Sequence, residues 1–167
     1  PFYDKELISM AAEESDMSED AFLHYDENMP FIKDPLDRHF YSPFSSIYQV
    51  PMSDQIFLAQ SRVIRKLADQ GPCVIVGRCS DYVLGERPEC LKVFIHGPLE
   101  DRVTRCVEEY HISTQNMIER VREIDRGRAN YYNYYTGHNW GEMRRYDLTL
   151  DSSVTGIEGA VELIAAL

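Results

Sequence analysis

Hydrophobic and polar residues follow two different periods along this chain. Continuous apolar runs at 73–76 and 91–95 and an alternating segment at 146–150 predict β-strands, and Pro1–Tyr3 fits the tail of another strand. Elsewhere apolar residues recur every three to four positions, which is the period of an amphipathic helix. This pattern predicts helices at 4–14, 54–70, 99–107, 113–124 and 157–167, with a short one after Ser18. Strands that alternate with helices indicate a parallel, helix-flanked sheet, so the predicted fold class is α/β.

The ends of these segments carry residues with known structural preferences. Four of them are of the types whose side-chain oxygens accept hydrogen bonds from the first turn of a helix. These predicted N-caps are Asp4, Ser18, Ser53 and Ser113. The runs at 73–76 and 91–95 contain little polar alternation, which is typical of parallel strands buried on both faces. The segment 151–153 is predicted to be a loop.

Residues 28–53 interrupt the regular pattern with repeated prolines and aromatic residues. Proline breaks helices, and a loop of this length in a compact domain is usually functional or disordered. The aromatic side chains could cover a substrate, form the contact of a homodimer, or anchor an ordinary loop to the core.

Composition limits the classes of function. A chain of 167 residues is large enough for one domain with its own core. The net charge of −11 argues against a nucleic-acid polymer as partner, because neutralising phosphates requires clustered Lys and Arg. The four cysteines form no C-x-x-C pair, so no metal site is predicted, and reduced thiols point to a cytoplasmic protein. No membrane span or signal peptide is recognisable.

Arginine is the residue type on which the predicted chemistry depends. Arg78 follows Gly77 at the carboxyl end of the run 73–76, and open α/β sheets bind ligands at that edge. A guanidinium there suits a phosphate or a carboxylate, although an arginine that merely pairs with an acid fits equally well. Arg102 and Arg105 lie three positions apart and therefore share one face of a predicted helix.

More arginines follow near the next predicted helix. Arg126 and Arg128 flank a glycine at or beyond the helix end, where the backbone could turn, and Asp125 could orient one guanidinium. Arg120 and Arg122 fit better as a solvated surface that balances the many acids. Phosphoryl transfer depends on positioning and on neutralising phosphate oxygens. A clamp for a polyphosphate would form if four side chains converge at one sheet edge, namely those of Arg78, Arg102, Arg126 and Arg128.

Other catalytic patterns are missing or ambiguous. The tyrosines at 131, 132, 134 and 135 could pack against the core or stack on a base, and packing fits most of them better. The five histidines are scattered, and neither a Ser-His-Asp nor a Cys-His arrangement can be read. The phosphate-loop pattern GxxxxGK[ST] does not occur in these 167 residues.

Several segments together resemble the cytidylate kinase-like family of nucleoside monophosphate kinases. They are Gly77-Arg78, LKVFI at 91–95, PLEDR at 98–102, IDRGRANYYNYYTG at 124–137 and LDSS at 150–153. The resemblance covers nearly the whole chain, and 124–137 is its most specific part. It implies a single kinase-like domain over 1–167, with a parallel, helix-flanked sheet of the P-loop nucleoside monophosphate kinase type. It further implies an acceptor-side insert at 28–53 and a helical lid arm at 113–141.

The resemblance also implies three groups of site residues. The substrate-binding residues would be Arg78, Asp81 and Asp125. The catalytic residues, which stabilise the charge of the transferred phosphoryl group, would be Arg102, Arg126 and Arg128. The residues on the ATP side would be Arg105, Asp151 and Ser152. A Mg²⁺ ion would bridge the donor phosphates, with no metal site made by protein ligands.

The chain departs from the family at its start. Family members begin with a strand, a glycine-rich phosphate loop and a helix, directly before a segment like Phe2-Tyr3-Asp4. In the family's sheet order, 2-3-1-4-5, that strand is central, so its absence would separate the strands at Tyr3 and Cys73 from those at Leu91 and Asp147. The exposed edges and faces would cost more than the about 5–15 kcal/mol that stabilises a typical domain. We therefore expect the chain to be an excerpt of a longer protein.

Three functions remain open from the sequence. The first is ATP-dependent phosphoryl transfer to a nucleoside monophosphate, with CMP or dCMP as the acceptor. The second is a non-catalytic module that lacks the phosphate loop and binds a nucleotide or a protein partner through 28–53. The third is a kinase of another small molecule, because the insert at 28–53 occupies the region in which such kinases hold their acceptor.

Overall fold

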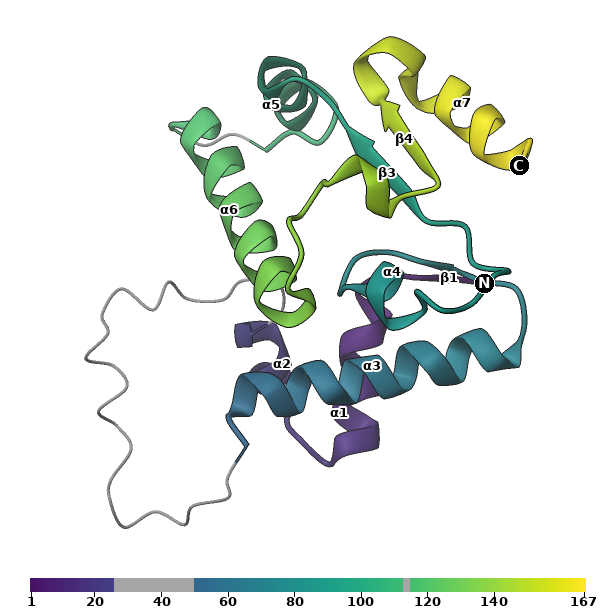
Figure 1. The fold of residues 1–167 in the computed structure, drawn as a ribbon. Coiled ribbons are helices and arrows are strands. Elements are labelled where there is room, and N and C mark those ends of the chain that lie inside the picture. Colours follow the sequence, from purple (N-terminus) through teal and green to yellow (C-terminus); the bar gives the residue numbers. More distant parts are fainter. Residues whose placement is uncertain (26–49, 113–114) are drawn as a thin grey trace.

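The computed structural model describes residues 1–25, 50–112 and 115–167. Most of the predicted insert at 28–53 and the predicted cap Ser113 lie outside the described residues. The elements, in chain order, are β1 (Phe2–Tyr3), α1 (Glu6–Ser15), α2 (Glu19–Tyr25), α3 (Met52–Gln70), β2 (Val74–Ile75), α4 (Ser80–Val83), β3 (Val93–His96), α5 (Leu99–Glu108), α6 (Met117–Thr136), the 3-10 helix η2 (Met143–Arg145), β4 (Leu148–Asp151) and α7 (Ser152–Ala165) (Figure 1). Within the described ranges, no helix is both long and apolar enough to cross a membrane.

The strands form two separate parallel pairs. β1 pairs with β2, with Phe2 opposite Val74, and β3 pairs with β4, with Val93 opposite Leu148. Figure 1 shows the first pair beside α1, α3 and α4, and the second beside α5 and α7. The prediction of parallel strands flanked by helices is confirmed. The described strands do not form one continuous sheet, because β1 and β2 are separate from β3 and β4, as expected when the central strand is absent. The division falls between β2 and β3, where the resemblance places a further strand.

Burial of the strands on both faces was also predicted, and this prediction is wrong. Val74 in β2 is 59% exposed and Ile95 in β3 is 55% exposed. A strand is buried on both faces only when it has a neighbour on each side and a helix layer over each face. Each strand described here has one neighbour, so apolar side chains such as those of Val74 and Ile95 remain partly in water, whereas Leu150 in β4 is buried.

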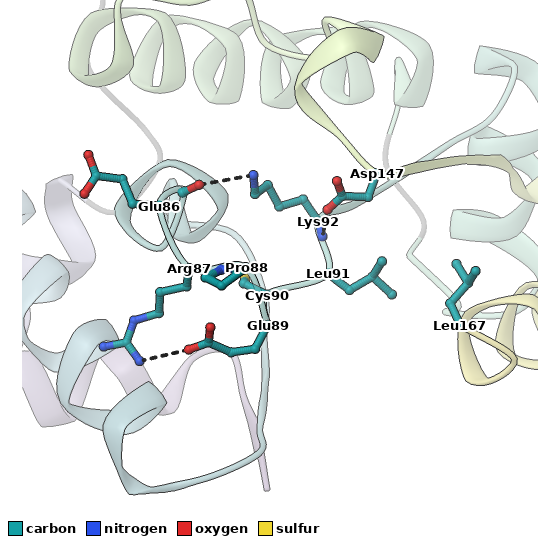
Figure 2. A pocket seen from close by; sticks show the side chains of 10 residues that line it. Glu86, Arg87, Pro88, Glu89, Cys90, Leu91, Lys92, Asp147 and Leu167 are labelled. Atoms are coloured by element: carbon teal, nitrogen blue, oxygen red, sulfur yellow. Dashed lines mark hydrogen bonds and ion pairs between the residues drawn. The ribbon is translucent and has the colours of Figure 1, made fainter.

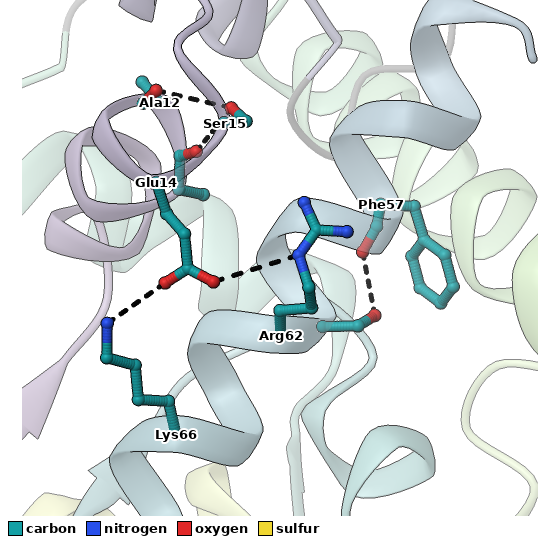
Figure 3. A network of polar contacts seen from close by, with 8 residues as sticks. Ala12, Glu14, Ser15, Phe57, Arg62 and Lys66 are labelled. Carbon is teal, nitrogen blue, oxygen red and sulfur yellow. Dashed lines mark hydrogen bonds and ion pairs between the residues drawn. The ribbon is translucent and has the colours of Figure 1, made fainter.

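The main hydrophobic core lies where α1 and α2 pack against α3. Its buried side chains include Leu7, Ile8, Phe22, Ile56, Val63, Ile64 and Leu67. On α3 these residues recur with the helical period, as the sequence predicted, and Gly71 ends the helix with a φ of 139°. At the surface of this contact, the Glu14 carboxylate lies between Arg62 and Lys66, at 3.8 and 3.3 Å (Figure 3). Exposed pairs of this kind contribute little stability.

Two of the predicted helix caps are wrong. α1 begins after Lys5 without a side-chain cap, because the Asp4 carboxylate pairs with Arg78. α3 begins at Met52 after Pro51, which places Ser53 inside the first turn. The cap at Ser18 is confirmed, since its Oγ accepts a hydrogen bond from the Ala21 amide at 3.4 Å.

The longest helix differs most from its prediction. α6 continues through Gly127 to Thr136, so the backbone does not turn between Arg126 and Arg128. Tyrosine side chains near its C-terminal end contact other helices, and these contacts hold the helix across a residue with low intrinsic helix propensity. The predicted arm at 113–141 is therefore, from Met117 onward, mainly one straight helix.

Candidate active site

The carboxyl ends of β3 and β4 bring three segments together. β3 ends at His96, and the Ser152 hydroxyl at the start of α7 donates a hydrogen bond to its carbonyl oxygen at 3.0 Å. Gly97 follows β3, and a Cβ added to it would lie 3.2 Å from Ser152 Oγ. The two segments therefore approach each other closely at a position that lacks a side chain.

Two arginines of α5 reach this edge. Arg105 Nη1 lies 3.5 Å from Ser152 Oγ, at the limit of a hydrogen bond. Arg102 forms a two-point ion pair with Asp125 of α6, with both N–O distances 2.9 Å, and this hydrogen bond raises the pKa of Arg102. The Nε atoms of Arg102 and Arg105 are buried, and neither has a hydrogen-bond partner within the described part of the chain, although Arg105 Nε lies 3.9 Å from the Glu109 carboxylate. The edge thus holds two guanidinium groups with N–H donors that an anion could use.

Asp151 closes the site from β4. Its carboxylate accepts hydrogen bonds from the amide and the hydroxyl of Ser153, at 3.0 and 2.7 Å, and these bonds lower the pKa of Asp151. Asp151 is thus the N-cap of the first turn of α7, and the predicted loop at 151–153 is wrong because this turn begins at Ser152. Gly156, whose φ of 65° is not helical, separates the turn from the rest of α7. The structure brings Arg105, Asp151 and Ser152 together, although their role toward ATP stays a prediction.

Arg78 lies in the other half of the molecule, at the carboxyl end of β2. Gly77, Arg78 and Cys79 all have φ between 51° and 72°, so three consecutive residues adopt the left-handed conformation. Such a turn is strained at the two residues that have a side chain. The guanidinium is 4% exposed and donates hydrogen bonds to Asp4 Oδ1 at 2.9 Å and to the Val76 carbonyl at 3.2 Å. Arg78 is therefore at the predicted edge, but it is engaged with an acid.

The α6 helix separates the predicted arginines into two groups. Arg126 pairs with Glu119 at 3.1 Å, and both side chains are about half exposed. Arg128 is two positions further on, so its side chain lies on a different face of α6. Arg128 instead shares a face with Asp125 and Tyr132, three positions before it and four after it. Arg78, Arg102 and Arg126 each pair with a different acid, so the convergence of the four arginines at one edge stays a prediction.

Tyrosine hydroxyls connect the C-terminal half of α6 to α3 and α4. Tyr131 donates to Gln60 at 2.9 Å, Tyr132 to Asp81 at 2.7 Å and Tyr135 to Asp54 at 3.3 Å. Burial raises the pKa of Tyr132 and of Tyr135 above the ordinary range of tyrosine. Phe57 stacks on Tyr135 with ring centroids 4.1 Å apart.

The predicted packing role is confirmed for Tyr131 and Tyr132, which are 3% and 4% exposed, whereas Tyr134 is 57% exposed. Sequence reasoning missed the partners Gln60 and Asp54. The available signal was that these two polar residues lie on a helix with a strong apolar face, where each polar side chain near that face needs a hydrogen-bond partner.

A surface pocket of about 400 Å³ lies away from these residues. It is lined by residues 85–92 together with Asp147 and Leu167, at the amino ends of β3 and β4 (Figure 2). Burial raises the pKa of the Cys90 thiol in its wall, so the reactive thiolate is disfavoured. None of the predicted site residues lines this pocket. Within the described ranges, no cluster of His, Cys, Asp and Glu could hold a metal ion.

The sequence pattern of the cytidylate kinase-like family matches residues 1–154. This chain belongs to the cytidylate kinase-like family.

Two individual proteins extend the comparison. A cytidylate kinase of Methanopyrus kandleri is 27% identical over 97 residues, which cover 53% of this chain and 50% of that protein. The chain thus spans about half the length of this curated relative. A crystal structure of an uncharacterized protein from Eubacterium ventriosum matches with a TM-score of 0.62 and 27% identity, covering 68% of this chain and 71% of that one.

Proposed function

We propose that this protein transfers the terminal phosphoryl group of ATP to a nucleoside monophosphate, and that the acceptor is CMP or dCMP. The observation that carries the proposal is the arrangement at the carboxyl ends of β3 and β4. There the Nη atoms of Arg102 contact the Asp125 carboxylate, and Nη1 of Arg105 lies 3.5 Å from the Ser152 hydroxyl, while the Nε atoms of both arginines are buried. Family membership supports nucleotide phosphorylation in general, and the choice of a cytosine acceptor rests on the family resemblance.

The residues divide between donor and acceptor. Arg105, Ser152 and Asp151 would hold ATP at the strand ends, where Gly97 allows the close approach of Ser152. Mg²⁺ would arrive with the ATP phosphates and supply charge neutralisation between them. Its ligands would be phosphate oxygens and water, as is usual for this ion.

Arg102 and Arg128 are the better candidates for contact with the transferred group. Arg102 lies at the strand ends, and Arg128 lies on the α6 face that also carries Asp125. Arg126 pairs with Glu119 in this structure, so contact between Arg126 and the transferred group would require α6 to rotate. Arg78, Asp81 and Asp125 would hold the acceptor monophosphate. For Arg78 this requires that the guanidinium be shared between Asp4 and the acceptor phosphate.

The test is a kinase assay on the natural full-length protein with ATP-Mg²⁺ and each of CMP, dCMP, UMP and AMP. We expect CMP or dCMP to be converted to the diphosphate with the highest kcat/KM. The Arg128→Ala variant should lower kcat by about a hundredfold or more, because donors that contact transition-state charge contribute factors of this size. Arg120→Ala is the matched control, since Arg120 is exposed and lies five positions before Asp125, which places it on the opposite side of α6, so kcat should be unchanged.

Failure of every monophosphate as acceptor would overturn the proposal. A melting temperature that rises with CMP but not with ATP, in a protein without activity, would favour the non-catalytic binding module. Phosphorylation of another small molecule in preference to all four nucleotides would favour the third function.

A further inference from the structure

One hydrogen bond joins the arginine-bearing helix to the acceptor-side turn. Tyr132 Oη of α6 donates to Asp81 Oδ2 of α4 at 2.7 Å. The tyrosine is 4% exposed, and Asp81 lies in the first turn of α4, directly after the left-handed residues Gly77 to Cys79. Arg145 and Tyr146 also lie beside the Tyr132 hydroxyl. The contact is therefore an enclosed polar cluster.

This bond differs from its neighbours in what it can control. Tyr131 and Tyr135 bond to α3, a helix of 19 residues whose inner face is part of the main core. Their loss would leave the position of α3 unchanged. Tyr132 bonds to α4, which has four residues, no buried side chain and no side-chain cap. A helix this short is not stable by itself, so contacts from outside determine where Asp81 lies.

The same face of α6 carries the other predicted site residues. Asp125 and Arg128 lie seven and four positions before Tyr132, which places all three side chains along one side of a straight helix. Asp125 binds Arg102 at the ATP-side edge, and Tyr132 binds Asp81 at the acceptor side. One rigid element thus connects residues predicted to hold the two substrates.

We propose that Tyr132 is a positioning residue that holds Asp81, and with it the turn from Gly77 to Asp81, in register with the arginine-bearing face of α6. The hydroxyl does not touch a substrate; it acts through the Asp81 carboxylate. The kinetic part of this inference rests on the proposed function, because it takes Asp81 to bind the acceptor monophosphate.

The first test compares Tyr132→Phe with Tyr131→Phe in the full-length protein. Both variants remove one buried hydroxyl from adjacent positions and keep the ring. For Tyr132→Phe we expect KM for CMP to rise about tenfold, since a hydrogen bond to a charged group is lost, with KM for ATP and kcat unchanged. For Tyr131→Phe we expect both KM values to stay at the wild-type level even if the melting temperature falls. Equal effects of the two variants on KM for CMP would overturn the proposal.

The second test asks whether Tyr132 acts through Asp81. In the Asp81→Asn background, Tyr132→Phe should raise KM for CMP by much less than it does in the wild type, because coupled residues are not additive. The same rise in both backgrounds would overturn the proposal. This measurement separates positioning from a general loss of stability, which would add to the effect of Asp81→Asn.

A third measurement needs no substrate. The amide of Val83 donates to the Cys79 carbonyl at 2.9 Å, and the amide of Ser80 donates to Gly77 at 3.0 Å. Hydrogen exchange at these amides should be about tenfold faster in Tyr132→Phe than in Tyr131→Phe, as expected for local opening of a weakly held segment. Equal exchange in the two variants would overturn the positioning role. If no monophosphate is phosphorylated by the wild type, the proposed function fails while this measurement still decides the role of Tyr132.

Discussion

Arg78 Nη1 and Asp4 Oδ1 lie 2.9 Å apart in a part-buried ion pair that joins positions 74 residues apart in the chain. Asp4 follows β1 directly, and Arg78 follows β2 across Gly77, so the pair closes the carboxyl end of the β1–β2 sheet. The guanidinium is almost fully buried, whereas the carboxylate is 40% exposed. Removing the carboxylate would therefore leave a buried charge, while removing the arginine would leave an acid that water can reach.

The asymmetry of this pair gives the first prediction. Asp4→Ala should lower the free energy of unfolding by about 2 kcal/mol, because the buried guanidinium loses its bond to the carboxylate while it keeps its bond to the Val76 carbonyl. Arg78→Met should cost less, because Asp4 can become hydrated. Urea unfolding of both variants measures the difference. Arg62→Ala, whose partner Glu14 is on the surface, is the control and should cost less than about 0.5 kcal/mol. Equal costs for Asp4→Ala and Arg78→Met would contradict the asymmetry.

The ion pair of Arg102 and Asp125 should stabilise the contact between α5 and α6 by a measurable coupling energy. We expect a double-mutant cycle with Arg102→Gln and Asp125→Asn to give a coupling energy of about 1–2 kcal/mol, because the pair is two-pointed and only partly exposed. The same cycle on Arg126 and Glu119, which are about half exposed, should give about 0.5 kcal/mol or less. Chemical unfolding supplies both values. A coupling no larger for the first pair than for the second would show that α5 and α6 are held together by other contacts.

Local patterns predicted those features that depend on near neighbours in sequence. The helical period of Ile56, Val63 and Ile64 located α3, because one continuous apolar stripe faces the core. The runs at 73–76 and 91–95 located β2 and β3, because β-branched and aromatic residues favour strands even where burial is incomplete. Family resemblance, rather than periodicity, placed Arg105, Asp151 and Ser152 in one site, and the structure brings them together.

Features that depend on distant partners could not be predicted. Asp4 has the composition of a helix cap, yet its carboxylate is taken by Arg78, and nothing near it in sequence indicates this. The helix across Gly127 depends on tyrosine hydroxyls that bond to α3 and α4. Burial of β2 and β3 depends on which neighbours each strand has, and a pattern within the strand does not contain that information.

Crowding at Gly97 gives a prediction about the strand ends. In Gly97→Ala the new Cβ would lie 3.2 Å from Ser152 Oγ, and the hydroxyl cannot move without weakening its bond to His96. We expect the free energy of unfolding to fall by about 1 kcal/mol and KM for ATP to rise. Gly159→Ala on α7 is the control, because its Cβ would make an ordinary 3.7 Å contact with Thr155.

Thermal unfolding and ATP kinetics distinguish the outcomes for Gly97. The control Gly159→Ala should be neutral or stabilising, as alanine is the better helix former. Gly97→Ala with wild-type stability and wild-type KM for ATP would mean that the strand ends relax easily and that the close approach is unimportant.

The cap of α7 predicts a dependence of stability on pH. Hydrogen bonds from the Ser153 hydroxyl and amide lower the pKa of Asp151 below 3.8, its ordinary value, so folding favours the ionised form. Its contribution is therefore fully present above pH 3.8 and is lost as the pH falls through the lower pKa of the folded state.

At neutral pH, Asp151→Ala should lower the melting temperature by about 2–4 °C, as expected for one lost cap in a chain of this size. The difference from wild type should shrink below pH 3.8. Asp151→Asn keeps an acceptor oxygen without the charge. Its melting temperature at neutral pH should therefore lie between those of wild type and Asp151→Ala, and residue 151 should add no pH dependence in this variant. A difference between wild type and Asp151→Ala that is constant from neutral pH to pH 3 would show that the carboxylate charge does not stabilise the cap.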